Sequence, residues 1–306
     1  MENVVTETQI TLCNETPYFL GSCFYYLTRS DPKQKLFVTV GFDYVQNEMI
    51  LDKDREFKST FHPSKAYQIY KSLPFEHASN CPCYQMNINS ELYSFVPSQR
   101  YVKLACCALI MDSKNRLLLT RRTKHLATFP CCWVGPGGRL DKGESLEECV
   151  LRESEEEVGI RLDKKSRQNG DIEYSYGGIE CEFKPFMVYE SVYPTQLDLG
   201  FPKSQNLILF YFLRLGIENT RVKVKIQENE VDKAIWISLS SLKAVIEGKI
   251  ETSDLGCFSV NSAGYPVTDF IPKDHLEGVY PNNIKEGIGE GHLRAIRCFL
   301  SSEFMT

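Results

Sequence analysis

The chain has 306 residues, a length that allows one large domain or two modest ones. Its hydrophobic fraction of 42% excludes wholesale disorder, and its net charge of −5 gives no reason to expect a broad nucleic-acid-binding surface. No stretch reaches the roughly 18 apolar residues of a membrane helix, and the N-terminus lacks the features of a secretory signal. We therefore expect a protein that is not secreted and resides in the cytoplasm, with the nucleus as an additional location.

Residues 1–95 form the first expected part, a strand-rich portion whose role the sequence does not reveal. A segment rich in β-forming residues predicts a strand at 35–42, and the segment 62–73 predicts a helix. The polar, turn-rich segment 76–90 predicts a linker to the next part.

The second part, residues 96–245, has clearer patterns. Apolar runs joined by a polar turn predict strands at 103–111 and 116–122. A short strand is predicted at 129–134, and the Gly-Pro-Gly-Gly run at 135–138 then breaks regular structure.

The next segment, 145–158, is predicted to be a helix because of its two ends. Ser145 fits an N-cap, with Glu148 three residues later as in a capping box. Gly159 stands in the usual position after a helix C-terminus.

Further strands and helices are predicted downstream. The strands are at 184–192, 207–215 and 233–239, and the helices at 238–249 and 290–300. The last helix belongs to the third part, 246–306, a C-terminal extension. Mixed strands with helices on both sides predict an α/β fold, a sandwich with a mixed sheet between helical layers.

The helix at 145–158 crowds like charges on one face. Residues three and four apart share a helix face, so Glu153 lies beside Glu156 and Glu157. Each such pair costs the helix roughly 0.2–0.5 kcal/mol. A hard cation such as Mg²⁺ prefers carboxylate oxygen and would offset this repulsion. A plain acidic surface helix is the alternative for the glutamates taken alone.

The surrounding spacing favours the metal interpretation. Gly138 is followed by Glu144, then by an Arg-Glu pair beginning at Arg152, and the pattern ends at Ile160. This pattern resembles the Nudix box, and every fixed glycine and charged position agrees. Ser154 departs from it, because the family usually has an aliphatic residue there that packs the helix against the sheet. We expect weaker packing at Ser154 and no loss of a ligand.

The resemblance implies a Nudix-type α/β/α sandwich and a hydrolase that uses water to cleave a pyrophosphate bond in a nucleoside diphosphate linked to another moiety. It implies Mg²⁺ or Mn²⁺ as cofactor, which neutralises phosphate oxygens and lowers the pKa of a bound water. The implied metal ligands are Glu153, Glu156, Glu157 and the backbone carbonyl of Gly138. Arg152 resembles the arginine that orients the glutamates, and Glu144 the residue that holds the loop and helix together.

The general base stays open among several glutamates. The resemblance assigns Glu156, Arg152 and Glu144 to catalysis, with Glu156 as a candidate base within the cluster. In many Nudix enzymes the base lies in a later loop. The glutamates there are Glu180, Glu182, Glu190, Glu228 and Glu230. For any single one of these, a solvated surface residue is the favoured interpretation.

The flanks of the box are similar to the type-17 branch of animal Nudix hydrolases. The similarity covers residues 100–245, through an LLLTRR strand, a WVGPGG entry to the box and a YESVYP stretch before an apolar strand. Gly135 stands where that branch typically has proline. The branch implies hydrolysis of methylguanosine-capped mRNA with release of m7GDP. Capped RNA is then the expected partner, with no membrane partner, and the oligomeric state stays open.

Candidate contacts to such a substrate are few. Stacking a methylated, positively charged base requires an aromatic ring, and Trp133 is the first candidate. Other aromatic residues nearby in the sequence are Tyr189, Tyr193 and Tyr211. Arg121 and Arg122 are candidates for phosphate or RNA, but neighbours in a strand point to opposite faces. Of the two, Arg121 is the predicted contact.

Two other functions remain as alternatives. One is a pyrophosphatase for coenzyme A, nucleotide sugars or dinucleotides, because LLLTRRTKHLATFP loosely resembles the coenzyme A branch. The other is a non-catalytic Nudix-fold module that binds a nucleotide. Such modules usually lose the glutamates, which this chain keeps.

Overall fold

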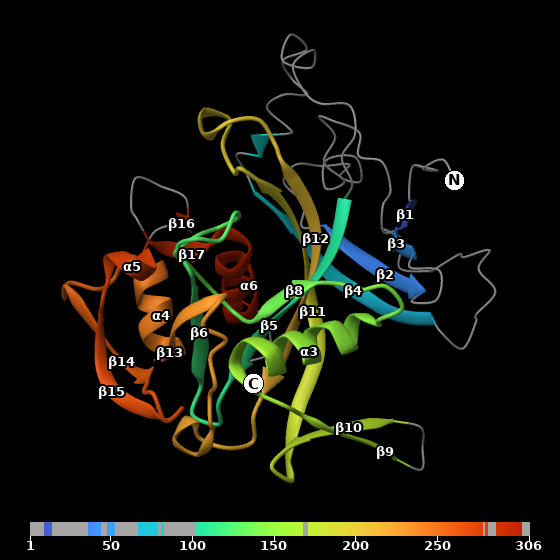
Figure 1. Cartoon of the computed structure of the whole chain (residues 1–306). Helices are drawn as coiled ribbons and strands as arrows, with labels where there is room; N and C mark the ends of the chain where they lie inside the picture. The colour runs from blue at the N-terminus through green and yellow to red at the C-terminus, as the bar shows by residue number, and fades with distance from the viewer. Residues whose placement is uncertain are drawn as a thin grey trace. The chain divides into compact units, whose positions relative to one another are not determined.

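The computed structural model describes residues 9–13, 36–43, 48–52, 67–78, 81–82, 102–167, 171–277, 279–280 and 286–301. The chain divides into two compact units, each assembled from three separate stretches. The first unit combines Met1–Cys106, Arg139–Cys149 and Pro185–Phe210. The second unit combines Cys107–Gly138, Val150–Lys184 and Tyr211–Thr306. Figure 1 labels the helices and strands of both units.

The first unit contains a sheet built from the N-terminal part of the chain. Its strands are β1 (Gln9–Cys13), β3 (Glu48–Asp52), β2 (Phe37–Asp43) and β4 (Tyr67–His77), in sheet order and antiparallel. β4 also pairs in parallel with β11 (Ile179–Tyr193), where His77 lies opposite Glu190. The expected strand at 35–42 corresponds to β2, and most of the described residues of the N-terminal portion lie in strands.

The segment 62–73 is not the helix that the sequence predicts. Residues 62–66 lie outside the described part of the chain, and the remainder forms the first half of β4. Its backbone pairs with β2, where Tyr70 lies opposite Val40. A short apolar pattern fits both a helix and a strand, and here the pairing with a distant strand decides between them. Most of the expected linker at 76–90 lies outside the described residues.

The second unit is built around a mixed sheet with β6 near its centre. Its strands, in sheet order, are β15 (Pro266–Pro272), β14 (Asp254–Val260), β13 (Val231–Ser238), β6 (Arg116–Arg122), β7 (Cys132–Val134), β17 (Gly287–Gly289) and β16 (Val279–Tyr280). The pairs from β15 to β7 are antiparallel, whereas β17 pairs in parallel with both β7 and β16. The predicted α/β class with a mixed sheet is therefore confirmed.

Four strands contribute residues to both units. They are β5 (Val102–Met111), β8 (Gly137–Arg139), β11 and β12 (Ser204–Arg214). Within the second unit, Met111 of β5 lies opposite Leu117 of β6, and the Ala108 N–H donates to the Pro136 carbonyl at 2.8 Å. The predicted strands at 103–111, 184–192, 207–215 and 233–239 correspond to β5, β11, β12 and β13.

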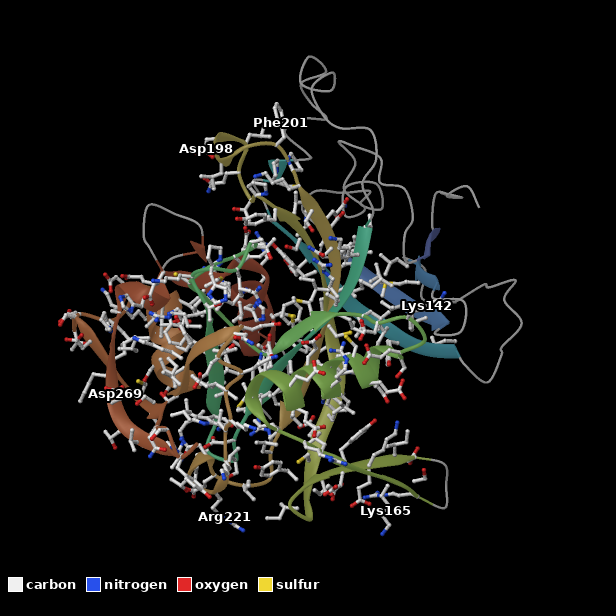
Figure 2. All side chains as sticks on the ribbon, in the orientation of Figure 1. Lys142, Lys165, Asp198, Phe201, Arg221 and Asp269 are labelled. Atoms are coloured by element: carbon white, nitrogen blue, oxygen red, sulfur yellow. The ribbon has the colours of Figure 1, made fainter. Side chains whose placement is uncertain are left out.

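Two hairpins of the second unit were not predicted. β9 (Asp163–Ser166) and β10 (Ile172–Tyr176) form an antiparallel arm with the start of β11. All four residues of β9 are exposed, and Figure 2 shows Lys165 pointing away from this arm. Most of β15, in the β14–β15 hairpin, is also exposed. Strands without a buried face carry no apolar alternation, so the sequence gives no signal for them.

The helices follow their sequence signals closely. They are α3 (Leu146–Val158), α4 (Leu239–Ile246), α5 (Asp274–Glu277) and α6 (Glu290–Ser301), with short 3-10 turns at η2 (Leu197–Leu199) and η3 (Asn219–Arg221). The capping box of α3 is present, because the Ser145 N–H donates to Glu148 at 2.8 Å and the Glu148 N–H donates to the Ser145 hydroxyl at 3.2 Å. Gly159 ends the helix with φ +70°. No helix among the described residues is long and apolar enough to span a membrane.

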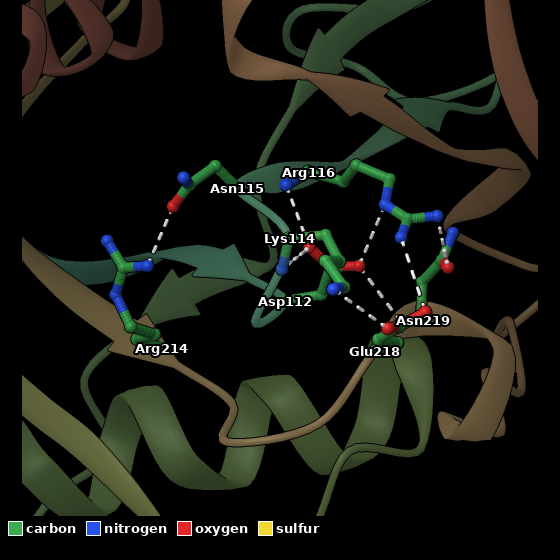
Figure 3. Close-up of polar contacts among 7 residues, drawn as sticks. All are labelled: Asp112, Lys114, Asn115, Arg116, Arg214, Glu218 and Asn219. Atoms are coloured by element: carbon green, nitrogen blue, oxygen red, sulfur yellow. Dashed lines mark hydrogen bonds and ion pairs between the residues drawn. The ribbon is translucent and has the colours of Figure 1, made fainter.

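The turn between β5 and β6 is held by the buried carboxylate of Asp112 (Figure 3). Its Oδ1 accepts the backbone N–H groups of Lys114 at 2.9 Å and Arg116 at 2.8 Å. Its Oδ2 accepts the N–H of Asn219 at 3.0 Å and lies 3.0 Å from the Arg116 guanidinium. This carboxylate has a donor for each oxygen, as a buried charge requires.

Candidate active site

Helix α3 places three glutamates of the box on one face at different depths. The side chain of Glu157 is 3% exposed, and that of Glu153 is 12% exposed. Glu156 is 51% exposed. The spacing of three and four residues places both Glu156 and Glu157 beside Glu153 on the helix surface. The second unit contains all three residues.

Arg152 holds two of these glutamates. Its Nη1 donates to Glu153 Oε1 at 2.8 Å and to Glu156 Oε2 at 3.0 Å. Charge-assisted hydrogen bonds of this kind fix a carboxylate more firmly than neutral ones. Arg152 thus reduces the repulsion between Glu153 and Glu156 and sets their orientation.

The box loop, residues 135–138, contacts the two deeper glutamates. The Gly137 N–H donates to Glu157 Oε2 at 3.2 Å. A Cβ atom added to Gly138 would overlap the Glu153 carboxylate, so any other residue there would displace that carboxylate from its present position. A Cβ atom on Gly135 would overlap the carbonyl oxygen of Ala108. The proline that the type-17 branch has at Gly135 therefore does not fit this backbone.

The two deeper glutamates are held in an environment that disfavours their charge. Burial is the main cause that raises the pKa of Glu157 to about 8, and the negative charge of Glu153 adds to it. Burial also raises the pKa of Glu153, against the lowering effect of Arg152. Carboxylates that are desolvated and close together are a common feature of functional sites.

Glu230 adds a fourth negative charge to this group. It precedes β13, and its charge raises the pKa of both Glu153 and Glu157. The Thr123 N–H donates to its backbone carbonyl at 2.9 Å, which ties its loop to the end of β6. Of the five later glutamates suggested by the sequence, Glu230 is the one that the structure brings into electrostatic contact with the box.

The other four later glutamates have different surroundings. Glu180 pairs with Arg167 and Glu182 with Lys184, and Glu228 is exposed. Glu190 belongs to the first unit, where it is fully buried and accepts a hydrogen bond from the Gln205 amide. The sequence carried no signal that separates Glu230 from these four.

Arg121 and Arg122 at the end of β6 have different partners. Arg121 donates to both carboxylate oxygens of Asp232, at 2.7 and 3.0 Å, and pairs with Glu286. The positive charge of Arg122 lowers the pKa of Glu157, so its guanidinium lies near the box glutamates. Strand alternation predicts that one of the two arginines faces the site, but it does not indicate which one.

The remaining residues singled out from the sequence make hydrogen bonds within the protein. Trp133 is 1% exposed, and its indole N–H donates to Glu286 at 3.1 Å. The Asp141 N–H donates to Glu144 in the first unit at 3.0 Å. Ser154 is 2% exposed, and its hydroxyl donates to the Val150 carbonyl at 2.7 Å. The serine therefore buries no unsatisfied hydroxyl.

The donor set of the cluster fits a hard divalent cation. Among the described residues, no three His, Cys, Asp or Glu side chains converge as they stand in an arrangement that could hold a metal. In this arrangement Glu156 accepts a hydrogen bond from Arg152. Glu153, Glu157 and Glu230 nevertheless interact electrostatically, and carboxylate oxygens are the ligands that Mg²⁺ and Mn²⁺ prefer.

Several known proteins resemble part of this chain. m7GpppN-mRNA hydrolase NUDT17 of Danio rerio is 30% identical over 179 residues, which are 57% of this chain and 54% of that protein. The Homo sapiens protein of the same name is 27% identical over 188 residues, or 60% and 53% of the two chains. The chain thus spans about half the length of these curated relatives. A solved MutT/nudix family protein from Enterococcus faecalis is 16% identical with a TM-score of 0.37, over 69% of this chain and 68% of that one.

A family model for the NUDIX domain matches residues 102–254, which is half of the chain. The matched range contains the whole box, the glutamates of α3 and Glu230. The chain therefore belongs to the Nudix family and is a Nudix hydrolase.

Proposed function

We propose that this Nudix hydrolase acts on m7G-capped mRNA and cleaves a pyrophosphate bond of the cap, releasing m7GDP. The observation that carries the proposal is the similarity to relatives named m7GpppN-mRNA hydrolase, which extends over 57% of the chain for the Danio rerio protein. The acidic face of α3 supports the reaction class, because hydrolysis of a diphosphate requires charge neutralisation at the phosphate oxygens.

The proposed ligands of Mg²⁺ or Mn²⁺ are Glu153, Glu156, Glu157 and the Gly138 carbonyl. When bound, the metal would neutralise phosphate oxygens and lower the pKa of a water molecule. Two of the glutamates are already desolvated and next to each other, so a cation would relieve their repulsion. Glu156 joins them by rotating away from Arg152, which keeps its contact to Glu153.

Glu156 and Glu230 are the two proposed candidates for the general base. Glu156 is half-exposed, so it can accept a proton from a water molecule and release it to solvent. Glu230 approaches the cluster from outside the helix, as its effect on Glu153 and Glu157 supports. A base must lie within hydrogen-bond reach of the attacking water, and both residues meet this requirement if that water lies over the cluster.

For the phosphate contact we propose Arg122 in place of Arg121. Arg121 is already paired with Asp232 and Glu286, whereas the charge of Arg122 acts on Glu157. A guanidinium beside the metal ligands is well placed to neutralise a phosphate oxygen. Trp133 is 1% exposed, so its ring offers no surface on which a base could stack.

The test is turnover of a substrate panel by the purified chain with Mg²⁺ or Mn²⁺. The panel contains capped RNA, coenzyme A, ADP-ribose and a dinucleoside polyphosphate. We expect m7GDP from capped RNA. The Glu156→Gln enzyme should lose on the order of 10²-fold in kcat, the usual contribution of a base. Glu155→Gln is the matched control, because Glu155 is the neighbouring exposed glutamate, paired with Arg161 and not with the cluster.

The panel also separates the alternatives. Faster turnover of coenzyme A or ADP-ribose than of capped RNA would overturn the cap assignment and leave the hydrolase class intact. Binding of nucleotides without turnover of any of the four would favour the non-catalytic nucleotide-binding module. Glu230→Gln compared with Glu228→Gln decides the base. A loss of kcat confined to Glu230→Gln assigns the general base to Glu230, and equal kcat values of the two variants leave that role with Glu156.

A further inference from the structure

The C-terminal segment, residues 286–301, lies outside the matched NUDIX range but contacts the strand that leads into the box. β17 pairs in parallel with β7, so that Gly287 lies opposite Cys132 and Ile288 opposite Trp133. A Cβ atom added to Gly289 would lie 3.2 Å from the Cys132 sulfur. The segment therefore forms a neighbouring strand of β7 and approaches it closely.

Glu286 fastens the beginning of this segment to both β6 and β7. Its Oε1 accepts a charged hydrogen bond from Arg121, and its Oε2 accepts the Trp133 indole N–H at 3.1 Å. His275 Nδ1 lies 3.2 Å from the same Oε2. The side chain of Glu286 is 15% exposed, and partly buried charged bonds of this kind resist separation.

His292 lies in the first turn of α6 and contacts the box loop. A Cβ atom on Gly135 would lie 3.6 Å from the Cδ2 atom of His292. A hydrogen bond joins the imidazole to the Gly135 backbone, and it raises the pKa of the ring. A hydrogen bond that raises the pKa of a histidine stabilises its protonated form, so the ring N–H is the donor. The acceptor is therefore the Gly135 carbonyl oxygen.

The ring of His292 is nevertheless neutral at physiological pH. Burial is the main cause that lowers its pKa to about 3, and the charge of Arg122 lowers it further. A neutral imidazole has one N–H, and this N–H is committed to Gly135. His292 is 8% exposed, so little water can compete for this hydrogen bond.

Gly135 is closely packed where a side chain would begin. A Cβ atom there would overlap the Ala108 carbonyl oxygen and would also lie 3.6 Å from the Cδ2 atom of His292. The next residues of the loop reach the glutamates, because the Gly137 N–H donates to Glu157 and Gly138 lies against Glu153. A shift of the Gly135 peptide would therefore move the loop against both carboxylates.

We propose that His292 is a positioning residue for the box loop, and that the C-terminal segment is part of the catalytic unit of this hydrolase. The ring N–H holds the Gly135 carbonyl, which sets where Gly137 and Gly138 meet the glutamates of α3. The inference rests on the proposed metal site for its effect on catalysis. The structural claim, that His292 fixes the position of the box loop, does not depend on that metal site.

The structural part is tested in the full metal-free chain by hydrogen exchange of a peptide covering residues 135–138. His292→Phe removes the donor and keeps an aromatic ring, and His292→Asn retains an N–H donor on a shorter side chain. Arg297→Gln is the matched control, because Arg297 is exposed on the same helix. We expect at least about tenfold faster exchange of the loop in His292→Phe, since the local opening energy falls by the value of one hydrogen bond, about 1.4 kcal/mol per factor of ten. His292→Asn should restore much of the protection, and Arg297→Gln should resemble the original chain.

The catalytic part is tested by the Mn²⁺ concentration that gives half of the metal-induced rise in Tm, and by kcat and KM. We expect His292→Phe to need several-fold more Mn²⁺ and to lose kcat with KM nearly unchanged, with partial rescue in His292→Asn. The proposal is overturned if the loop exchanges at the original rate in His292→Phe, or if His292→Asn protects the loop no better than His292→Phe does.

If the chain hydrolyses none of the four substrates, the proposed function fails, while the exchange and Tm measurements still decide the role of His292. If His292→Phe does not fold, His292→Leu, which also removes the ring N–H donor, takes its place in the exchange and Tm measurements and is compared with His292→Asn and Arg297→Gln.

Discussion

Asp112 and Glu157 are both buried carboxylates of the second unit, but they are satisfied to different degrees. Asp112 accepts three backbone N–H groups and pairs with the Arg116 guanidinium (Figure 3). Glu157 accepts one N–H, from Gly137, among the described residues, and two further glutamates add negative charge around it. The contrast shows that burial alone does not mark a functional carboxylate.

The difference lies in what stabilises the ionised form. A buried carboxylate with full hydrogen bonding fixes local structure, and the surrounding protein already offsets its desolvation. A buried carboxylate with too few donors and like-charged neighbours is stabilised by an added cation. Asp112 therefore belongs to the scaffold and Glu157 to the proposed metal site.

The largest expected effect is on the scaffold side of this comparison. Asp112→Ala should lower the free energy of unfolding by about 3–5 kcal/mol, because it leaves three backbone N–H groups without their acceptor and removes the buried partner of the Arg116 charge. Urea unfolding measures this loss. Lys114→Ala is the control, since its ion pair with Glu218 is exposed and should contribute under about 1 kcal/mol. Equal effects of the two changes would contradict the scaffold role of Asp112.

The second expected effect is on catalysis. Glu157→Gln keeps an acceptor for the Gly137 N–H but removes the negative charge, so folding should persist while kcat falls on the order of 10²–10³-fold. The rise in Tm caused by Mn²⁺ should shrink in parallel. Full activity of Glu157→Gln would remove Glu157 from the proposed metal ligands.

A smaller effect is expected in the pH dependence of the metal-free chain. The pKa of Glu157 is raised from 4.5 to about 8 in the folded state. Between these values the folded chain holds a proton that the unfolded chain has released, so stability falls as pH rises. From pH 6 to pH 8 this group should remove about 2 kcal/mol of unfolding free energy. Below the unfolded pKa its contribution is fully present.

Chemical unfolding in EDTA at the two pH values measures this slope, and Glu157→Gln is the reference for all other titrating groups. The difference between the two chains isolates Glu157. Added Mg²⁺ or Mn²⁺ should stabilise the original chain most at pH 8, because the cation binds the ionised carboxylate. Identical slopes for the two chains would show that the Glu157 environment is less desolvated than its burial indicates.

The smallest expected effect concerns Ser154. Ser154→Ala loses the hydrogen bond to the Val150 carbonyl but gains helix propensity of about 0.5 kcal/mol. The two changes nearly cancel, so the free energy of unfolding should stay within about 0.5 kcal/mol and kcat should be unchanged. A loss of several kcal/mol would show that the hydrogen bond of the Ser154 hydroxyl contributes far more to stability than this balance allows.

Local signals in the sequence predicted α3 well. Ser145, Glu148 and Gly159 define its ends through backbone hydrogen bonds that span a few residues. The segment 62–73 shows the limit of such reasoning, because a short apolar pattern became part of β4 through pairing with β2. Strands β9 and β15 were missed since most of their residues are exposed.

The sequence by itself determined the family, the reaction class and the face of the helix that carries Glu153, Glu156 and Glu157. These follow from spacing along one helix and from fixed glycine positions, which are local properties of the chain. The tertiary structure decided that Arg122 acts on Glu157 while Arg121 is paired elsewhere, and that Glu230 and His292 belong beside the box. Their places depend on strand pairing and burial between segments far apart in the chain, and residue spacing along the sequence carries no record of either.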